Sequence, residues 1–448
     1  MSLTSARIPT TAARFVRMGT FGLVVTVLLL SSLQVVAHAE GAPSSKQGAS
    51  QSSKQGAQHA KKQGKKQGKK NRGKGTKARK VSVRGTLASL PPVVQPGLSP
   101  AAPSDNGSLV ATFTPADPGR KVTLERQAAR GWKAVSTSTE DSWGSAAFSP
   151  APGTYRARTT TGGRTWVTGS VTTTRWTPQF EDTFSGTTLD TTVWNDQKRE
   201  HESVYAPRTC ARVAPSARRV GEGVLHLGVA LDPARAGLPC DYTSTRTSGT
   251  SPYLLNSQVA TEHTRFFRHG IVAARIKPQR AKGMHSGLWL LPSGTKYTDG
   301  VPAAGAEIDV MEFFGETGRG NETVGSHIHY YEAGWDKVSL GDTFKDARQV
   351  LGEGRSWWDE FHVFSVEWTP TEYIFRVDGR EYYRETGAVS QADQYLVLSN
   401  LTSDYELHEL TADEVSDTAQ VDWVRVFDAS SQESVRVTRG RKVAKKRA

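Results

Sequence analysis

Apolar and polar residues alternate in short runs along the chain from residue 175 to residue 428. Tyr373–Val377 and Arg380–Tyr383 flank Asp378-Gly379, a dipeptide that favours a tight hairpin turn. Roughly 250 residues of strand pattern with few helical periods predict an all-β fold, either a large sandwich or a jelly roll. The other predicted strands are Ile271–Ile276, Leu288–Leu291, Glu307–Phe314, His327–Tyr331, Phe361–Trp368 and Tyr395–Leu398.

Residues 81–174 have shorter β-rich runs, separated by turns rich in Pro, Gly and Asp. This spacing is typical of a small immunoglobulin-like β-sandwich. No catalytic cluster accompanies it, so a spacer and a carbohydrate-binding module both remain open. The predicted strands are Ser108–Phe113, Lys121–Arg126, Thr154–Thr159 and Thr165–Val171.

The first 39 residues have the pattern of a signal peptide. Arg7, Arg14 and Arg17 precede an apolar stretch near Phe21–Leu30, and Ala37-His38-Ala39 has the small-residue spacing of a cleavage site. The alternative is an uncleaved membrane anchor, but the apolar stretch is short for a span. We therefore expect a secreted protein, either extracellular or associated with the cell wall.

Charge is concentrated at the two ends of the chain. Residues 41–80 carry thirteen Lys or Arg and no acid, and residues 429–448 carry seven basic residues and one Glu. With +2 from residues 1–40, the ends sum to +21 against +13 for the whole chain, so residues 81–428 carry −8. This mildly acidic body argues against a nucleic-acid groove.

The basic segment at 40–80 contains almost no apolar residues. It and the basic segment at 429–448 are predicted to be disordered, as a linker and a tail. A solubilising spacer and a contact with an anionic cell-wall surface are the two interpretations of this charge.

Cys210 and Cys240 are the two cysteines of the chain. An oxidising compartment permits a disulfide between them, with two buried free thiols as the alternative. Two cysteines without a suitable histidine cluster make a zinc site an unfavourable interpretation.

Three carboxylates lie within six residues in the run Glu307-Ile308-Asp309-Val310-Met311-Glu312. Along a regular strand Glu307 and Asp309 share one face, whereas Glu312 points to the other. One extra residue in a β-bulge, predicted at Val310-Met311, returns Glu312 to the shared face. Strand spacing then leaves about 5–6 Å between the two Glu carboxyl groups, near the separation that retaining glycosidases use.

This run resembles the E-x-D-x-x-E signature of glycoside hydrolase family 16, in its bulged, laminarinase-like variant. The resemblance extends over about residues 178–428 and is strengthened by flanking segments in the expected order. These segments are Gly270–Lys277, Gly287–Leu291, His329-Tyr330, Phe361–Trp368 and Val421–Val426.

The resemblance implies a concanavalin-like β-jelly roll of two curved antiparallel sheets across residues 175–428, with a sugar-binding cleft on the concave face. Glu307 would be the nucleophile, Glu312 the general acid/base and Asp309 the supporting carboxylate. Other site residues are implied less directly: Trp289 and Trp368 as sugar platforms, with core packing as the alternative for both, His329 and Arg275 as sugar contacts, and Asp422 as a ligand of a structural Ca²⁺.

The sequence thus predicts a monomeric, retaining endo-β-glycanase that needs no cofactor for catalysis, acting on a β-1,3- or β-1,3-1,4-glucan. A transglycosylase with the same residues and a non-catalytic carbohydrate-binding lectin on the same fold are the alternatives. Met284-His285-Ser286 and the segment Ser399–Asp404 depart from the pattern of many laminarinases. Both belong to predicted cleft regions, so the polysaccharide, including a galactan, stays open.

Overall fold

The computed structural model describes residues 82–95, 106–196, 208–244, 246–293, 304–316, 323–332, 336–344, 351–352, 354–428 and 441–442. The predicted signal peptide and the basic linker lie outside these residues, as does most of the C-terminal tail. Within the described part, no helix has the length and apolar character that a membrane span needs.

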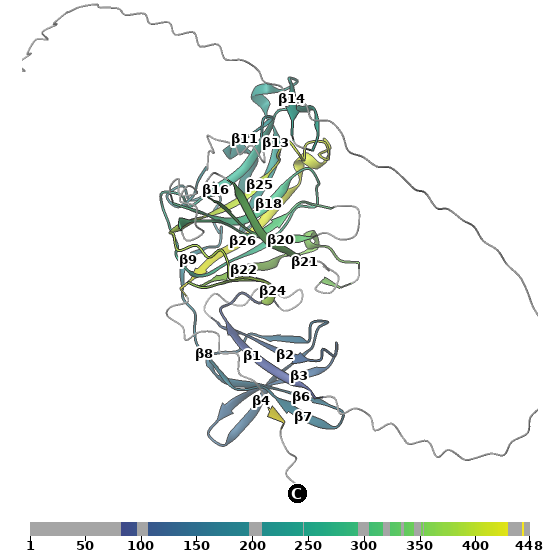
Figure 1. Cartoon of the computed structure of the whole chain (residues 1–448), viewed down its shortest axis with the longest axis vertical. Helices are drawn as coiled ribbons and strands as arrows, with labels where there is room; N and C mark the ends of the chain where they lie inside the picture. The colour runs from purple at the N-terminus through teal and green to yellow at the C-terminus, as the bar shows by residue number, and fades with distance from the viewer. Residues whose placement is uncertain are drawn as a thin grey trace, which may run out of the picture. The chain divides into compact units, whose positions relative to one another are not determined.

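Strands dominate the described chain, and its helices are short turns (Figure 1). The strands from residue 178 onward are β9 (Pro178–Asp182), β10 (Asn195–Asp196), β11 (Ala211–Val213), β12 (Arg218–Gly221), β13 (Val224–Leu231), β14 (Pro239–Thr243), β15 (Ser248–Pro252), β16 (Leu254–Ala260), β17 (Gly270–Lys277), β18 (His285–Pro292), β19 (Glu307–Phe313), β20 (Val324–Tyr331), β21 (Lys337–Phe344), β22 (His362–Trp368), β23 (Tyr373–Val377), β24 (Arg380–Glu385), β25 (Gln394–Leu401) and β26 (Thr418–Phe427). Four three-residue 3₁₀ turns are η1 (Pro215–Ala217), η2 (Pro233–Arg235), η5 (Trp357–Asp359) and η6 (Glu414–Ser416).

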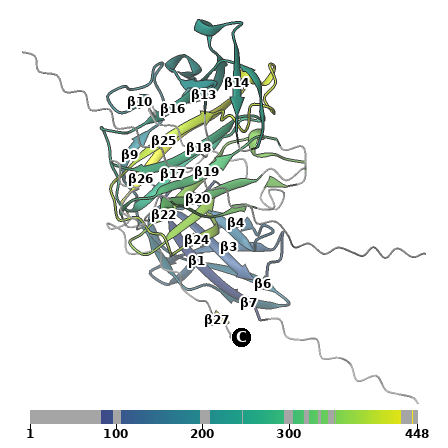
Figure 2. The same cartoon turned by 45° about the horizontal axis from the view of Figure 1, so that its top comes forward.

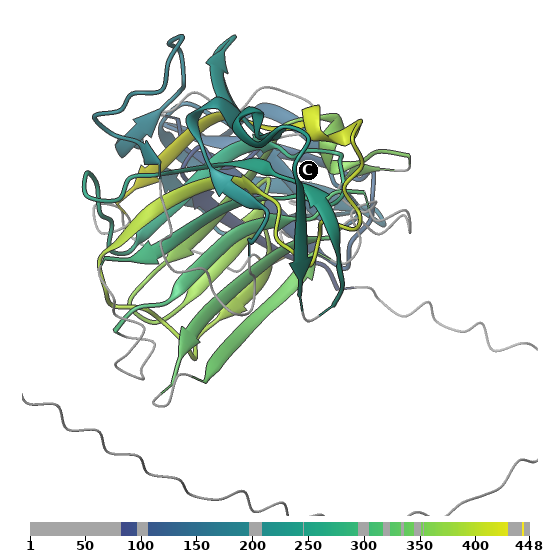
Figure 3. The same ribbon diagram turned by 90° about the horizontal axis from the view of Figure 1, so that it is seen from above.

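These strands form two curved layers that are joined along one edge. The first layer has the order β21-β20-β19-β18-β25-β16, and the second has the order β13-β26-β17-β22-β23-β24. The edge is shared because β13 pairs with β26 through Leu225–Gly228 and with β16 through Val229–Leu231. Figures 2 and 3 show the long strands of these layers side by side. The fold is the predicted all-β jelly roll.

The main core lies between the two layers. Leu288 and Ile308 of the first layer and Val272 and Phe364 of the second are all fully buried in one cluster. Because side chains alternate along a strand, the other face of the first layer is left for a different use. That face carries the candidate site.

The predicted hairpin between β23 and β24 is confirmed. Asp378 and Gly379 both have positive φ, at 50° and 79°, which is the backbone of a tight turn that suits the twist of the two strands. The predicted strands of this region all appear, and most extend one to three residues beyond the predicted ends. Side-chain alternation therefore located the strands well and their ends less well.

The preceding strands are β1 (Arg84–Leu90), β2 (Ser108–Thr114), β3 (Lys121–Ala128), β4 (Gly131–Thr139), β5 (Ser145–Phe148), β6 (Gly153–Thr161), β7 (Arg164–Val167) and β8 (Val171–Thr173). They form a β1-β2-β5 sheet and a second sheet of β7, β6, β3 and β4, in which β8 pairs with β6 and the short β27 (Arg441–Lys442) pairs with β7. A core of their own includes Leu109, Val122 and Tyr155. The immunoglobulin-like assignment stays a prediction.

One predicted strand in this region is wrong. The run Thr165–Val171 is divided into β7 and β8 by Thr168–Ser170. The Thr168 hydroxyl donates to the Gly169 carbonyl and accepts from the backbone N–H of Ala157. The hydroxyl thus takes the backbone N–H of Ala157 at the break, while the Thr168 N–H still donates to the Ala157 carbonyl over 2.9 Å.

The predicted disulfide between Cys210 and Cys240 is present, with an S–S distance of 2.05 Å. It joins the residue that precedes β11 to strand β14, and both cysteines are buried with Met284 and Leu407. It thereby ties together two segments that lie beside the candidate site.

Replacing both cysteines by alanine should lower the free energy of unfolding by roughly 3 kcal/mol, because the cross-link lowers the conformational entropy of the unfolded chain. Urea unfolding of the double variant, beside oxidised and reduced wild type, measures this. Equal stability of oxidised and reduced wild type would mean that the bond constrains nothing in the unfolded state.

Candidate active site

The predicted bulge in strand β19 is confirmed. Asp309 pairs with His327 of β20, and the next pair is Glu312 with Gly325, so that Val310 and Met311 together oppose Ser326 alone. The register against β18 shifts at the same place. Val310 and Met311 are buried in the core between the layers, whereas Glu312 lines the cleft with Glu307 and Asp309.

Ser326 holds the bulge in place. A bulge removes a carbonyl from the strand ladder, and the Ser326 hydroxyl donates to the Val310 carbonyl over 2.7 Å. Ser326 is itself fully buried and also contacts the Tyr382 hydroxyl. A buried polar side chain thus satisfies the backbone group that the extra residue displaces.

The three carboxylates line a cleft of about 410 Å³ on the face of the first layer opposite the core. Trp289 of β18 also lines it, and its indole N–H donates to the Ser399 hydroxyl over 3.0 Å. The indole is thereby fixed, but it is only 8% exposed and also packs in an apolar cluster with Leu291 and Tyr395, so its role as a sugar platform stays a prediction. The other lining residues are Arg208, Arg246, His285, Gly287, Phe314, His327, His329, Tyr331, Lys337, Ser399, Leu401 and Tyr405.

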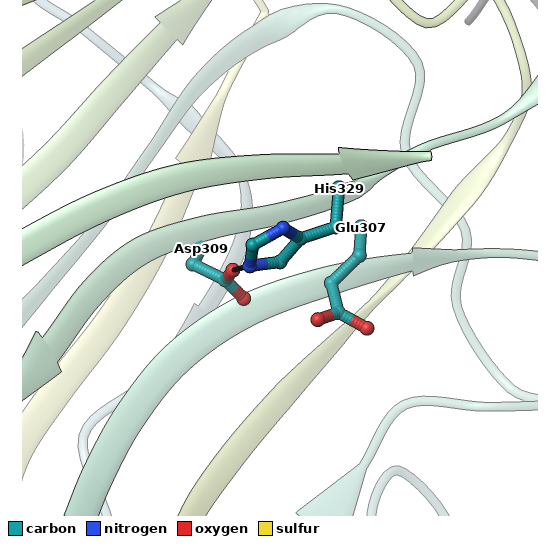
Figure 4. A group of neighbouring side chains, drawn as sticks. All are labelled: Glu307, Asp309 and His329. Atoms are coloured by element: carbon teal, nitrogen blue, oxygen red, sulfur yellow. Dashed lines mark ion pairs between the residues drawn. The ribbon is translucent and has the colours of Figure 1, made fainter. Parts of the chain in front are cut away.

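His329 contacts the central carboxylate, as Figure 4 shows. Its Nε2 lies 3.3 Å from Asp309 Oδ2, and its Nδ1 lies 2.8 Å from the Ser339 hydroxyl. Glu307 projects from the same strand as Asp309 toward the same side, directly opposite His329 in the strand register. His329 thus lies in the cleft beside the carboxylates, and its predicted contact with the sugar stays a prediction.

His327 makes the equivalent contact with Glu312. Its Nδ1 lies 2.6 Å from Glu312 Oε2, and the rings of His327 and His329 are stacked with centroids 5.8 Å apart. The two histidines are two residues apart on one face of β20. The two carboxylates that they contact lie on β19, one on each side of the bulge. Each of these two carboxylates therefore has its own imidazole.

The pKa values of the central groups move in opposite directions. Burial raises the pKa of Asp309 to about 7, and the charges of Glu312 and Glu307 add to this effect. Burial also opposes ionisation of Glu312, but the hydrogen bond from His327 and the charges of three histidines outweigh it and lower the pKa of that carboxyl. Since the groups titrate together, the proton belongs to the cluster, with Asp309 as its main holder.

The histidine pKa values are raised in turn. The hydrogen bond to Glu312 raises the pKa of His327 against the effect of its burial. Burial likewise lowers the pKa of His329, but the hydrogen bond and charge of Asp309 outweigh it and leave that pKa raised. Protonated histidines beside carboxylates are the compensation that three clustered acids need.

On spacing alone, two groups of three side chains could hold a cation: Glu307, Asp309 and His329, and Asp309, Glu312 and His327. A histidine must be neutral to bind a metal, and here each histidine has a raised pKa and a carboxylate partner.

Trp368 is not a sugar platform, contrary to one of the two interpretations of the sequence. Its side chain is fully buried in the core between the layers, and its indole N–H donates to the Ser390 carbonyl over 3.0 Å. It packs edge-on against His269. Strand periodicity placed Trp368 on a buried face, and that face proved to be the core.

The predicted sugar contact of Arg275 is also wrong. Its Nη1 lies 2.6 Å from Asp422 Oδ2, and its guanidinium lies over the Phe361 ring. Arg275 and Asp422 belong to β17 and β26 of the second layer, away from the residues that line the cleft.

The same ion pair bears on the predicted calcium ligand. One oxygen of Asp422 is engaged with a guanidinium, which does not fit the all-oxygen shell that Ca²⁺ prefers. The calcium site stays a prediction.

Sequence reasoning missed a third histidine–carboxylate pair, whose histidine lines the cleft. His285 Nδ1 lies 2.8 Å from Glu406 Oε2, and the His285 ring stacks on Phe314 with centroids 5.1 Å apart. Glu406 also accepts from the backbone N–H of Ser403. In the sequence His285 stands out only within a departure from a family pattern, and its partner lies 121 residues away.

A bulged strand that carries three carboxylates above an aromatic-lined cleft on a jelly roll is the kind of site that cleaves or binds carbohydrate. Residues 240–424 match the model of the glycosyl hydrolases family 16. This match lies within the β-jelly-roll part of the chain and includes all three carboxylates of β19.

Two curated proteins are similar to the chain. Glucan endo-1,3-beta-glucosidase A1 of Niallia circulans is 26% identical over 276 residues, which cover 55% of this chain and 37% of that protein. A beta-1,3-glucan-binding protein of Penaeus monodon is 30% identical over 115 residues, which cover 25% of this chain and 30% of that protein. The chain thus spans about a third of the length of each.

Among solved structures, the catalytic domain of an endo-1,3-beta-glucanase (laminarinase) from Thermotoga petrophila matches with a TM-score of 0.44 and 20% identity. The match covers 56% of this chain and 98% of that domain.

Replacing His327 by glutamine should shift the high-pH limb of the kcat/KM profile to higher pH. The imidazolium stabilises ionised carboxylates, so its removal raises the pKa values of Glu312 and of the cluster. The shift is measured as kcat/KM against pH, on a polysaccharide that the wild-type protein hydrolyses. An unchanged limb, or one that moves to lower pH, would show that His327 does not set the ionisation of Glu312.

Proposed function

We propose that this protein is a secreted, retaining endo-β-glycan hydrolase. The observation that carries the proposal is the bulged β19, which brings Glu307, Asp309 and Glu312 together on the cleft face. The spacing of the outer carboxylates remains the predicted 5–6 Å that direct nucleophilic attack would use.

In the first step, a Glu307 carboxylate oxygen bonds to the anomeric carbon while the glycosidic C–O bond breaks. A proton passes through Glu312 to the leaving oxygen. In the second step, water attacks the same carbon, releases Glu307 and returns a proton through Glu312. No redox group or other cofactor takes part in this exchange.

Electrostatics refine the role of Glu312. Its pKa is lowered by His327, whereas the pKa of Asp309 is raised to about 7. The proton that Glu312 delivers is therefore held by the cluster of Asp309, Glu312 and His327 before the reaction. Near neutral pH, protonated Asp309 also keeps the total negative charge beside Glu307 low enough for burial.

A β-1,3- or β-1,3-1,4-glucan backbone is the proposed substrate. The similarity to the glucan endo-1,3-beta-glucosidase A1 of Niallia circulans supports the β-1,3 linkage and the endo mode. Trp289 supplies the aromatic platform for a sugar unit beside the carboxylates.

Two other functions use the same cleft. A transglycosylase would replace the attacking water by a sugar hydroxyl, with no change in the named residues. A non-catalytic lectin is favoured by one observation, the match to a glucan-binding protein of Penaeus monodon. Against the lectin stands the cost of keeping three carboxylates together, which binding alone does not require.

Secretion and association with the cell wall are part of the proposal and rest on the sequence of residues 1–80. The signal peptide would direct export, and the basic linker and tail would hold the enzyme near anionic surfaces.

Glu307→Gln and Glu312→Gln should each lower turnover by about 10²–10⁴-fold or more, with the larger loss at Glu307. Both changes keep side-chain size, so thermal unfolding should stay near that of wild type. Reducing-end release from a polysaccharide panel measures the effect.

Glu381→Gln on the exposed part of β24 is the matched control and should keep full turnover. Near-normal turnover in either cleft variant would refute the assigned roles. Binding without turnover in wild type would favour the lectin.

A further inference from the structure

The cleft carries more positive charge than a neutral sugar requires. Arg208, Arg246 and Lys337 line it together with the three carboxylates. Arg208 directly precedes the segment that enters β11, Arg246 lies in the turn between β14 and β15, and Lys337 begins β21. Three segments far apart in the sequence each supply one cation to the same space.

Arg246 and Lys337 are not needed to neutralise the acids that have histidine partners. Glu312 has His327, Asp309 has His329, and Glu406 has His285 as a partner. Among the residues that the structure describes, no carboxylate forms an ion pair with Arg246 or Lys337. Arg246 instead lies over the Tyr405 ring, with 5.0 Å from the guanidinium to the ring centroid.

The backbone near Arg208 and Arg246 is anchored by a disulfide and by side-chain hydrogen bonds. Cys210, two residues after Arg208, is bonded to Cys240 of β14, the strand that leads into the turn of Arg246. Thr209 is fixed as well, because its backbone N–H donates to Asp404 Oδ1 over 2.9 Å and its hydroxyl donates to Asp404 Oδ2. A disulfide and two hydrogen bonds thus anchor the backbone segments that carry these two arginines.

Lys337 acts on the other part of the site. It lies opposite Tyr331 in the register of β20 and β21, and its charge lowers the pKa values of His327 and His329. A cation at that position works against the protonated histidines, so it does not help to hold the catalytic charges. Its placement fits a bound anion better than it fits the reaction.

We propose that the polysaccharide of this enzyme carries anionic groups, carboxylates or sulfate esters, that bind Arg208, Arg246 and Lys337. This inference rests on the proposed function and narrows its substrate class. Arginine suits both groups because its fork of N–H donors matches two oxygens of a carboxylate or a sulfate. The competing explanation is that the cations only adjust the pKa values of the carboxyl cluster.

The test uses the full chain with Glu307→Gln, so that binding is measured without turnover. The probes are laminarin, sulfated laminarin and carboxymethylated laminarin, beside a neutral galactan and its sulfated derivative. Affinity is measured with and without Arg246→Gln and Lys337→Gln in the same protein. Arg219→Gln on the exposed part of β12 is the matched control. Because every variant keeps the basic linker and tail, their contribution cancels in the comparison.

We expect the two substitutions together to lower the ratio of charged to neutral affinity about fivefold to tenfold, and 0.3 M salt to do the same. The Arg219 control should leave the ratio unchanged. The sulfated and carboxymethylated arms show which anion is preferred.

The inference would be overturned if the ratio of charged to neutral affinity were unchanged in the double variant, or if none of the charged probes bound. Hydrolysis by wild type that is lost in Glu307→Gln tests the proposed function separately. The inference can therefore fail while the proposed function stands.

Discussion

The site depends on one extra residue in one strand. Without the bulge at Val310 and Met311, Glu312 would point into the core between the two layers, where an unpaired carboxylate is strongly unfavourable. With the bulge, both intervening residues pack into the core and all three acids reach the cleft. The hydrogen bond from Ser326 to the Val310 carbonyl satisfies the backbone at this point.

The clustered acids repel one another, and side chains of the adjacent strand offset this repulsion. His327 and His329 on β20 face Glu312 and Asp309 on β19, and the resulting pairs keep Glu312 ionised while Asp309 retains a proton near neutral pH. A simple picture in which Glu312 alone has a raised pKa does not describe this site. A glycosidase needs one carboxyl group that holds a proton and one that is ionised. Here the proton is shared within the cluster and is not fixed on one catalytic residue.

Much of this was accessible from the sequence, because it depends on local rules. Side-chain alternation, the Asp378-Gly379 turn and the count of residues between Asp309 and Glu312 each follow from backbone geometry. The bulge could be predicted because only one insertion aligns the acids. The single pair of cysteines left one partner choice.

What failed depends on contacts between distant segments. Periodicity identifies a buried face but not whether the core or the cleft covers it, so Trp368 and Arg275 were assigned to the wrong surroundings. His285 with Glu406 and the paired positions of Arg208 and Arg246 arise only when the fold is closed. His327 was the one omission with a local signal, because it lies two residues before His329 on the same strand face.

The most direct test of this account is to trap the reaction intermediate. A 2-deoxy-2-fluoro glycoside that matches the cleaved backbone slows breakdown of a glycosyl-enzyme and leaves the sugar on the nucleophile. Peptide mapping by mass spectrometry should then locate the sugar on Glu307 in wild type and find none in Glu307→Gln. A sugar attached to Asp309 or Glu312, or turnover with no covalent adduct and inverted product, would contradict the account.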